Sequence, residues 1–378
     1  MPIPSELPPF PPGQSRRDFS RFMALAAAGI ALPRGTSEGE LAHAALRLVP
    51  PSGAIRLNSN ENPLGPSRAA LDAMAQLGTE EGRYAFKADA ALRQRIAELE
   101  DLRPEYIATF NGSSDPLHRA VLAFTSPDHP YVYGEPGFEA GWQAAKVSGA
   151  PAIPVPLTPT LAHDAAAMCA ASPTPGMLYI CNPNNPTGTT TPREQIVWAL
   201  ANKPAGAILL VDEAYIHFSD EMSVVGLVNA HADLLVLRTF SKLYGMAGLR
   251  MGLAIAQPPV LDRLAAFGPG MVSITGVTAA RTSLDDPTLV PMRRAYTRQA
   301  REETFAFLRK YGYGFYPSVS NCFMLDAKRP AGELATAMAQ QNVLIGRTWP
   351  SWPNYARVTV GTPDEMRTFC SALRAVTV

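Results

Sequence analysis

The stretch Ala207-Ile208-Leu209-Leu210-Val211-Asp212-Glu213-Ala214-Tyr215 places two carboxylates at the end of an apolar run of strand length. A second run, Leu234-Leu235-Val236-Leu237, leads into Thr239-Phe240-Ser241-Lys242. Continuous apolar runs are typical of strands buried on both faces, as in parallel sheets that helices cover. The two stretches therefore predict buried strands that carry ionisable groups at their ends.

On both sides of these runs, strand-like segments alternate with amphipathic ones. We expect strands over 106–110, 130–133, 152–156, 177–181, 207–211, 234–237 and 251–256, and helices over 90–99, 117–124, 138–147 and 193–201. This alternation predicts a mainly parallel sheet between helices. From about residue 269 the pattern changes to a long helix over 289–311, strands over 321–325, 343–345 and 357–360, and a last helix over 364–375. The change predicts a second, smaller α+β domain.

The composition limits the class of protein. Of the 378 residues, 47% are apolar and 17% are charged, and 33 basic side chains balance 33 acidic ones. This length exceeds what one hydrophobic core usually serves, which rules out a small disulfide scaffold and favours more than one domain. The balanced charge argues against a nucleic-acid-binding protein. The four cysteines form no Cys-x-x-Cys pair, which argues against a zinc or redox site.

The N-terminus resembles an export leader. Arg16-Arg17 and Phe19 precede an apolar run over 23–32, which is too short to span a bilayer. This pattern predicts a twin-arginine signal, with Ala42-His43-Ala44 as a cleavage site and a periplasmic or exported product. The alternative is an amphipathic N-terminal helix on a cytoplasmic enzyme. No later segment has the length of a membrane span, so we expect no stable membrane anchoring.

Lys242 is a candidate for amine chemistry. It follows a buried strand, and desolvation there disfavours the ammonium form and lowers the pKa. An amine that is neutral near pH 7 forms a Schiff base with a carbonyl. The alternative is a lysine whose head group reaches solvent at the strand end.

Asp212 ends its apolar run, so its carboxylate needs a partner there. The protonated ring nitrogen of pyridoxal phosphate is such a partner, and an aspartate that holds it makes the ring an electron sink. Strand-end aspartates also bind metals or cap helices. Only the adjacent Glu213 lies at ligand spacing, so we expect no metal.

A phosphate site is indicated by Gly112-Ser113-Ser114-Asp115, which opens a helical stretch after an expected strand. Helix N-termini bind phosphate, although a Ser-Ser-Asp run is more often a helix cap. Thr239 and Ser241 flank the lysine, and Arg250 offers a guanidinium fork. One phosphorylated ligand would account for all of these features.

Together these motifs resemble a known family, the fold type I pyridoxal-phosphate aminotransferases of classes I and II, and most closely the histidinol-phosphate aminotransferase branch. The resemblance runs from about Ile55 to the C-terminus and rests on five segments: Leu57-Asn58-Ser59-Asn60-Glu61-Asn62-Pro63-Leu64-Gly65-Pro66, Asn182-Pro183-Asn184-Asn185-Pro186-Thr187-Gly188, Asp212 to Tyr215, Ser241-Lys242 and Ala356-Arg357-Val358-Thr359-Val360-Gly361-Thr362.

The resemblance implies an α/β fold whose large domain has a mainly parallel seven-stranded sheet between helices, with a smaller α+β domain. The expected parts of the chain are a leader over 1–44, an N-terminal arm over 45–63 that joins the small domain, a large cofactor-binding domain over 64–268 and a small domain over 269–378. It also implies a homodimer with shared active sites.

The resemblance further implies roles for individual residues. Lys242 would bind the cofactor's aldehyde and move the proton, Asp212 would pair with the pyridine nitrogen, and Asn185 and Tyr215 would bind the phenolic oxygen. Phe138 would stack on the ring. The residues expected around the phosphate are Ser113, Ser114, Asp115, Thr239, Ser241 and Arg250, with Tyr84 from the partner chain. Position 113 departs from the glycine usual in the branch.

On the substrate side, the resemblance implies that Arg357 clamps a carboxylate, with Asn185 beside it. Arg347 lies near the position of an arginine that binds the substrate phosphate. We therefore expect transfer of an amino group between an amino acid, or histidinol phosphate, and a 2-oxo acid. Aromatic amino acid transfer and a lyase resembling threonine-phosphate decarboxylase remain alternatives, as does an exported protein that binds amino acids without turnover.

Overall fold

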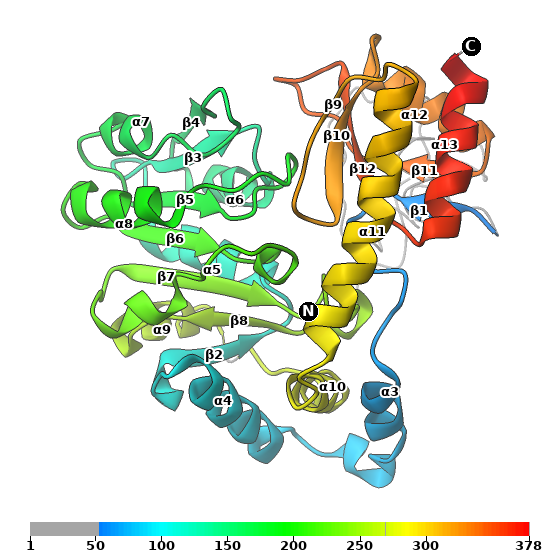
Figure 1. Cartoon of the computed structure of the whole chain (residues 1–378). Helices are drawn as coiled ribbons and strands as arrows, with labels where there is room; N and C mark the ends of the chain where they lie inside the picture. Colours follow the sequence, from blue (N-terminus) through cyan, green and yellow to red (C-terminus); the bar gives the residue numbers. More distant parts are fainter. Residues whose placement is uncertain (1–52, 269, 378) are drawn as a thin grey trace, which may run out of the picture. The chain divides into compact units, whose positions relative to one another are not determined.

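The computed structural model describes residues 53–268 and 270–377, all but two of which belong to the compact unit Ile55–Val378. The predicted leader over 1–44, with its arginine pair, lies outside the described residues. The fold of the described unit is built on one large sheet and a second group of shorter strands (Figure 1).

The large sheet has seven strands in the order β2-β8-β7-β6-β5-β3-β4. The strands are β2 (Ile107–Phe110), β3 (Tyr131–Glu135), β4 (Ala152–Pro156), β5 (Met177–Cys181), β6 (Ile208–Asp212), β7 (Leu234–Thr239) and β8 (Gly252–Ile255). Only β8 runs antiparallel to its neighbours, β2 and β7. The prediction of a mainly parallel seven-stranded sheet is therefore confirmed, and each strand lies within two residues of its expected bounds.

Both faces of the sheet are buried because successive side chains of a strand point to opposite sides. On β6, Leu209 and Val211 belong to one hydrophobic core, whereas Ile208 and Leu210 belong to the other. The first core is covered by α4 (Phe86–Glu100), α7 (Ala165–Ala170), α8 (Arg193–Asn202) and α10 (Ile274–Leu284), and the second by α5 (Ser114–Phe124), α6 (Ala140–Ser148) and α9 (Pro258–Ala265). This two-sided cover is the physical reason for the uninterrupted apolar runs.

A third core lies apart from the large sheet. Its strands are β9 (Phe315–Tyr316), β10 (Cys322–Asp326) and β12 (Tyr355–Thr359), paired antiparallel in the order β12-β10-β9, and β1 (Ile55–Leu57), paired parallel with β11 (Val343–Ile345). The helices α11 (Leu289–Lys310), α12 (Ala331–Gln340) and α13 (Pro363–Thr377) pack on them. Through β1, the first described residues of the chain thus join a core made otherwise of its last third (Figure 1).

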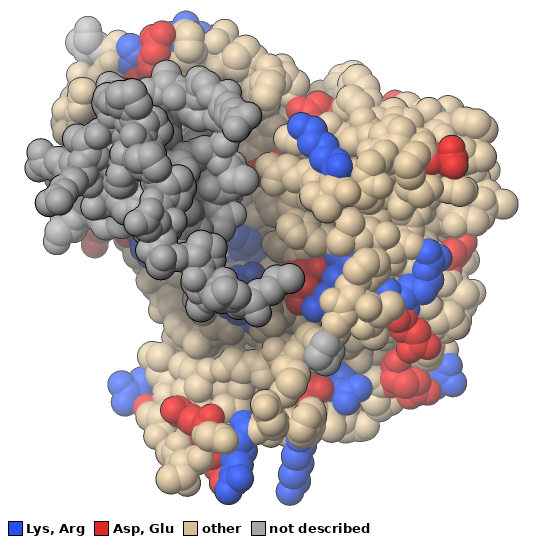
Figure 2. Space-filling view, turned by 180° about the vertical axis from the view of Figure 1, so that it is seen from behind, with Lys and Arg blue, Asp and Glu red and all other residues tan. Residues whose placement is uncertain are grey.

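Among the described residues, the remaining elements are α3 (Arg68–Ala75) and five short 3₁₀ turns, η1 (Gly78–Gly82), η2 (Pro104–Tyr106), η3 (Ile216–Phe218), η4 (Val225–Asn229) and η5 (Ala247–Leu249). On the face shown in Figure 2, acidic and basic side chains lie interspersed. Among the described residues, no helix combines the length and the apolar character that a membrane crossing requires.

Candidate active site

Lys242 lies three residues beyond the carboxyl end of β7. Its Nζ donates hydrogen bonds to the main-chain oxygens of Asn60, at 3.1 Å, and Ser59, at 3.4 Å. The same amine lies 5.6 Å from the centre of the Tyr215 ring. Burial, together with the nearby Arg357 guanidinium, lowers the pKa of Lys242 to about 8. The amine is therefore enclosed by protein and is half neutral at mildly alkaline pH, as the sequence predicts.

Asp212 ends β6, directly opposite Cys181 of β5 in the parallel register. Its Oδ2 accepts a hydrogen bond from the Tyr179 hydroxyl at 3.0 Å, and its Oδ1 accepts one from the Ala214 N–H at 3.1 Å. Burial raises the pKa of Asp212 to about 6 in spite of these hydrogen bonds. No group of three or more potential metal ligands occurs among the described residues. The carboxylate is thus oriented but lacks a full counter-charge.

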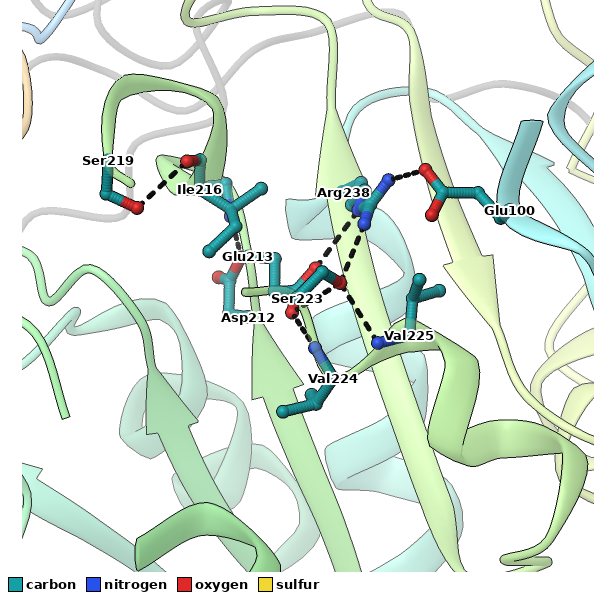
Figure 3. A network of polar contacts seen from close by, with 10 residues as sticks. Glu100, Asp212, Glu213, Ile216, Ser219, Ser223, Val224, Val225 and Arg238 are labelled. Carbon is teal, nitrogen blue, oxygen red and sulfur yellow. Dashed lines mark hydrogen bonds and ion pairs between the residues drawn. The ribbon is translucent and has the colours of Figure 1, made fainter. Parts of the chain in front are cut away.

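A buried ion-pair network fixes the chain on the other side of Asp212 (Figure 3). Glu213 accepts hydrogen bonds from Arg238 Nε at 3.0 Å, from the Ser223 hydroxyl and from the Val224 N–H at 2.8 Å. Arg238, on β7, also pairs with Glu100 at the end of α4. The network ties β6, β7 and α4 together directly behind the aspartate.

Arg357 of β12 reaches the carboxyl edge of the large sheet. Its Nη1 donates to Asn185 Oδ1 and its Nη2 to the main-chain oxygen of Asn58, both at 2.8 Å. The guanidinium also lies 5.7 Å from the centre of the Trp349 ring. Its buried Nε has no hydrogen-bond partner. Arg357 is therefore held in place with a donor to spare, as binding of a carboxylate requires.

Arg250, Ser241, Thr239 and Gly112 form a candidate anion cradle beside the lysine. Its Nη1 lies 3.5 Å from the Ser241 hydroxyl, and its Nη2 donates to the main-chain oxygen of Asn111 at 3.0 Å. The Thr239 hydroxyl lies 3.0 Å from that of Ser241. At Gly112, with φ +82°, a Cβ atom would lie 2.1 Å from Arg250 Nη2. Glycine thus lets the guanidinium approach the turn that leads into α5.

The residues that open α5 divide into two groups. Ser113 precedes the helix with no side-chain cap hydrogen bond, and Ser114 is its first residue. Asp115 instead pairs with Arg119 at 2.6 Å, and Arg119 also donates to the main-chain oxygen of Gly268. Ser113 and Ser114 therefore lie at the N-terminus of the helix, whereas the carboxylate of Asp115 is already engaged by Arg119.

Three predicted residues lie away from this constellation or have other partners. Tyr84 is 74% exposed, with its ring 5.7 Å from that of Phe86. Arg347 forms an ion pair with Glu139. Phe138 is half-buried and packs against the second core of the sheet. Within one described chain, Tyr84 does not reach the lysine.

Sequence reasoning missed Tyr179, Trp349 and the particular role of Asn60. Tyr179 lies in an apolar strand, where the sequence gives no reason to expect more than a core tyrosine. Its contact with Asp212 appears only in the folded chain. Trp349 is buried and donates from its ring nitrogen to the main-chain oxygen of Gly137 at 2.8 Å. Asn60 lies within the 57–66 segment, which gave a signal for the family but not for the individual residue.

Known proteins share this fold and are similar in sequence. The model of the family "Aminotransferase class I and II" matches residues 52–373. A histidinol-phosphate aminotransferase of Symbiobacterium thermophilum is 36% identical over 329 residues, which cover 85% of this chain and 90% of that protein. A crystal structure from Erwinia carotovora atroseptica SCRI1043, assigned to the histidinol-phosphate aminotransferases, aligns with a TM-score of 0.82 and 31% identity over 86% of this chain and 96% of that one.

The chain therefore belongs to the class I and II aminotransferases and has their fold type I architecture. Within that family it is a pyridoxal-phosphate-dependent aminotransferase of the histidinol-phosphate aminotransferase kind. A histidinol-phosphate aminotransferase of Sinorhizobium meliloti, solved in complex with pyridoxal-5′-phosphate, shares the fold with a TM-score of 0.78 and 24% identity over 85% of this chain and 90% of that one.

The residues present here fit that cofactor. The enclosed amine of Lys242, the buried carboxylate of Asp212 and the cradle at Gly112 and Arg250 correspond to its aldehyde, its ring nitrogen and its phosphate. The charges of the cofactor also complement those of the site. Its protonated ring nitrogen would supply the counter-charge that Asp212 lacks, and its phosphate would face the Arg250 guanidinium.

Proposed function

We propose that this enzyme moves an amino group between histidinol phosphate, or an amino acid, and a 2-oxo acid. The observation that carries the proposal is the position of the Lys242 amine between Tyr215 and the main-chain oxygen of Asn60, with its pKa lowered to about 8. An amine of that pKa both adds to carbonyl groups and accepts a proton near neutral pH. The names of the curated relatives support the choice of substrate.

The chain's own residues divide the remaining work. Arg357, with its spare Nε, would bind the carboxylate of the 2-oxo acid, and Asn185 holds the guanidinium in the required plane. Asp212 would hold the proton on the ring nitrogen, and the Tyr179 hydroxyl orients that carboxylate. When bound, pyridoxal phosphate supplies an aldehyde and a ring that accepts the electrons of a deprotonated α-carbon. The Lys242 amine then takes and returns that proton.

Substrate selection is assigned to the loop that carries Arg347 and Trp349. Arg347 would bind the phosphate of the amino donor, either after release from Glu139 or while it remains paired with that carboxylate. Guanidinium groups bind phosphate through two parallel hydrogen bonds, so the loss of this group affects a phosphorylated donor most. Arg347→Ala is expected to raise KM for histidinol phosphate and to leave KM for the 2-oxo acid unchanged. Equal increases for both substrates would remove Arg347 from this role.

A spectral titration tests the reaction itself. Purified enzyme with bound cofactor is mixed with histidinol phosphate, with aromatic amino acids or with other amines, and the conversion of the cofactor to its amine form is followed by absorbance. Conversion by histidinol phosphate, reversed by a 2-oxo acid, is the expected result. Release of CO₂ without consumption of a 2-oxo acid would support a decarboxylase instead, and conversion by aromatic amino acids alone would change the donor. Lys242→Ala is the inactive control.

The proposed assembly is a homodimer in which Tyr84 serves the partner's site. The support is an exposed apolar cluster: Tyr84 is 74% exposed, Phe86 is 69% exposed and Met271 is 44% exposed. Phe86 and Met271 also line one cavity of about 350 Å³. Exposed apolar groups gathered in this way are typical of surfaces that another protein covers. A second copy of the chain would bring its Tyr84 to a site that Tyr84 of the same chain does not reach.

Export is proposed from the leader alone. Arg16, Arg17 and the apolar run over 23–32 form a twin-arginine pattern, and that route carries proteins that are already folded. Replacing both arginines by lysine is expected to retain the protein in the cytoplasm. Cell fractionation followed by immunoblotting measures this, with the unaltered chain as control. Unchanged export of the double variant would contradict the assignment and favour a cytoplasmic enzyme with an N-terminal helix.

A further inference from the structure

Asn60 has an unusual position in the segment between β1 and α3. It is fully buried, and its backbone adopts the left-handed conformation with φ +52°. Asparagine tolerates this conformation better than most residues do. Each polar group of the residue, in the side chain and in the main chain, has a hydrogen-bond partner from elsewhere in the fold.

One side of Asn60 is fixed by Thr359 of β12. The Asn60 N–H donates to the Thr359 hydroxyl at 2.9 Å, and that hydroxyl donates to Asn60 Oδ1 at 3.1 Å. A hydroxyl has only one hydrogen, and this one is directed to Oδ1. The reciprocal pair therefore fixes both the backbone and the plane of the side-chain amide.

The other side of Asn60 faces the reacting groups. Its Nδ2 donates to the Tyr215 hydroxyl at 3.0 Å and lies 3.1 Å from Cys322 Sγ. Its main-chain oxygen accepts from Lys242 Nζ at 3.1 Å and from Asn321 Nδ2 at 3.3 Å. One residue thus contacts both the amine that the proposed reaction uses and the phenol that is expected to bind the cofactor.

We propose that Asn60 is a positioning residue that aims the Tyr215 hydroxyl at the cofactor. This inference rests on the proposed function. Because the Tyr215 oxygen accepts an N–H from Asn60, the hydrogen of its own hydroxyl is directed to a different acceptor. With the cofactor bound, its phenolic oxygen would be that acceptor.

Neighbouring segments of the same chain support this arrangement. Asn62 Nδ2 and Arg293 Nη1 both donate to the main-chain oxygen of Leu243, at 2.8 and 2.9 Å. At Gly245, with φ +72°, a Cβ atom would lie 2.1 Å from the main-chain oxygen of Gly65. The loop that carries the lysine and the segment that carries Asn60 are therefore packed together at several points, and Asn60 has little freedom to move away.

The experiment separates aiming from general support of the fold. The variants are Asn60→Gly, which keeps the main-chain oxygen and tolerates positive φ, and Asn60→Asp, which keeps the size but cannot donate an N–H. Each is made in the Lys242→Ala background, so that binding is non-covalent. The readout is the Kd of pyridoxal phosphate compared with that of its 3-deoxy analogue, which lacks the phenolic oxygen.

The Asn60 variants are expected to bind pyridoxal phosphate about tenfold more weakly, the value of one hydrogen bond of ~1.4 kcal/mol. The Asn60 substitutions are expected to leave the affinity for the 3-deoxy analogue unchanged. In chains that also carry Tyr215→Phe, they are expected to change the affinity for neither ligand. Asn62→Ala is the matched control, because it removes an amide of the same segment that does not contact Tyr215. It is expected to leave the ratio of the two affinities unchanged.

Equal weakening of both ligands by Asn60→Gly, or weakening that persists after Tyr215→Phe, would overturn the proposal. If Asn60→Gly fails to fold, Thr359→Val serves the same purpose, because it removes the hydroxyl that fixes the Asn60 amide while conserving volume. Failure of the proposed function is distinguishable, since it would appear as a lack of turnover in the unaltered enzyme and would not affect these binding ratios.

Discussion

Asp212 destabilises the cofactor-free protein at neutral pH. Its pKa is raised from 3.8 to about 6 by burial, so the folded state binds more protons than the unfolded state between these pH values. Stability therefore falls as the pH rises through this window. Asp212→Asn is expected to stabilise the cofactor-free protein at pH 8, on the order of 3 kcal/mol, and to weaken cofactor binding.

Chemical denaturation at pH 8 and at pH 4 measures this effect. The asparagine can keep both contacts, since Oδ1 still accepts from the Ala214 N–H and Nδ2 donates to the Tyr179 hydroxyl. The gain is expected to be smaller at pH 4, where the aspartate is mostly protonated in the folded state. A variant less stable than the parent at both pH values would show that the carboxylate stabilises the empty site.

Lys242 gives a second prediction at the scale of single residues. With a pKa lowered to about 8, its reaction with an amine-specific reagent in the cofactor-free enzyme is expected to rise with a midpoint near pH 8. The charge of Arg357 contributes to the shift, so Arg357→Gln is expected to move the midpoint upward. Mass spectrometry of the labelled peptide measures both. A midpoint at the ordinary value of 10.5 would contradict burial of the amine.

At the scale of elements, the network behind Asp212 links β6, β7 and α4 through buried charges (Figure 3). Arg238→Met is expected to destabilise the fold by about 3–5 kcal/mol, because it leaves Glu213 buried without a counter-charge. The double variant Arg238→Met, Glu213→Gln is expected to recover part of this loss. Urea denaturation measures both, and additive losses would show that the two side chains act independently.

The turn from β2 into α5 gives another prediction. Gly112→Ala is expected to displace the Arg250 guanidinium, since the added Cβ would lie 2.1 Å from Nη2 at a φ of +82°. The affinity for pyridoxal phosphate is expected to fall at least tenfold, whereas the affinity for pyridoxal, which lacks the phosphate, stays the same. Gly226→Ala, where a Cβ meets no atom within 4 Å, is the control. Equal losses for both ligands would place the phosphate elsewhere.

The elements themselves were largely predictable because their physical causes are local. The β6 segment is a run of apolar residues that ends at a carboxylate, and its strand ends at the same place. In contrast, α3, α7, α9, α10 and α12 were not predicted. In α10, Ser283 and Gly276 are buried among apolar residues, so its sequence lacks a clear apolar stripe. The helix α10 packs against α3 and α4, which lie far from it in the sequence and meet it only in the folded chain.

At the scale of the whole molecule, the cluster of Tyr84, Phe86 and Met271 predicts the oligomeric state. Phe86→Glu is expected to convert a dimer to monomers, because it places a charge in an apolar interface. Sedimentation velocity measures this, and loss of cofactor is expected to accompany it through Tyr84. Val147→Glu, at a residue 80% exposed on α6, is the control. A monomeric parent protein would contradict the shared site.

The candidate site was predictable in part. Lys242, Asp212, Tyr215 and Arg250 follow strands or lie in compact motifs, so their proximity follows from the shared edge of a parallel sheet. Asn60 could not be assigned in the same way, because its partners lie as far as 299 residues away. The contacts of Asn60 depend on how the small group of strands that includes β12 meets the large sheet, and no single segment of the sequence shows this.

The contact between Asn60 and Thr359 also has a consequence for synthesis. A ribosome that has completed the large sheet has already made the lysine and the aspartate, but the strand that locks Asn60 comes only at residues 355–359. Contacts of such sequence separation form late. A message cut short before β12 would therefore yield a chain that contains Lys242 and Asp212 but lacks the strand that fixes Asn60 beside the lysine amine. A chain that stops before β12 is therefore expected to have no activity at all, although most of its residues are present.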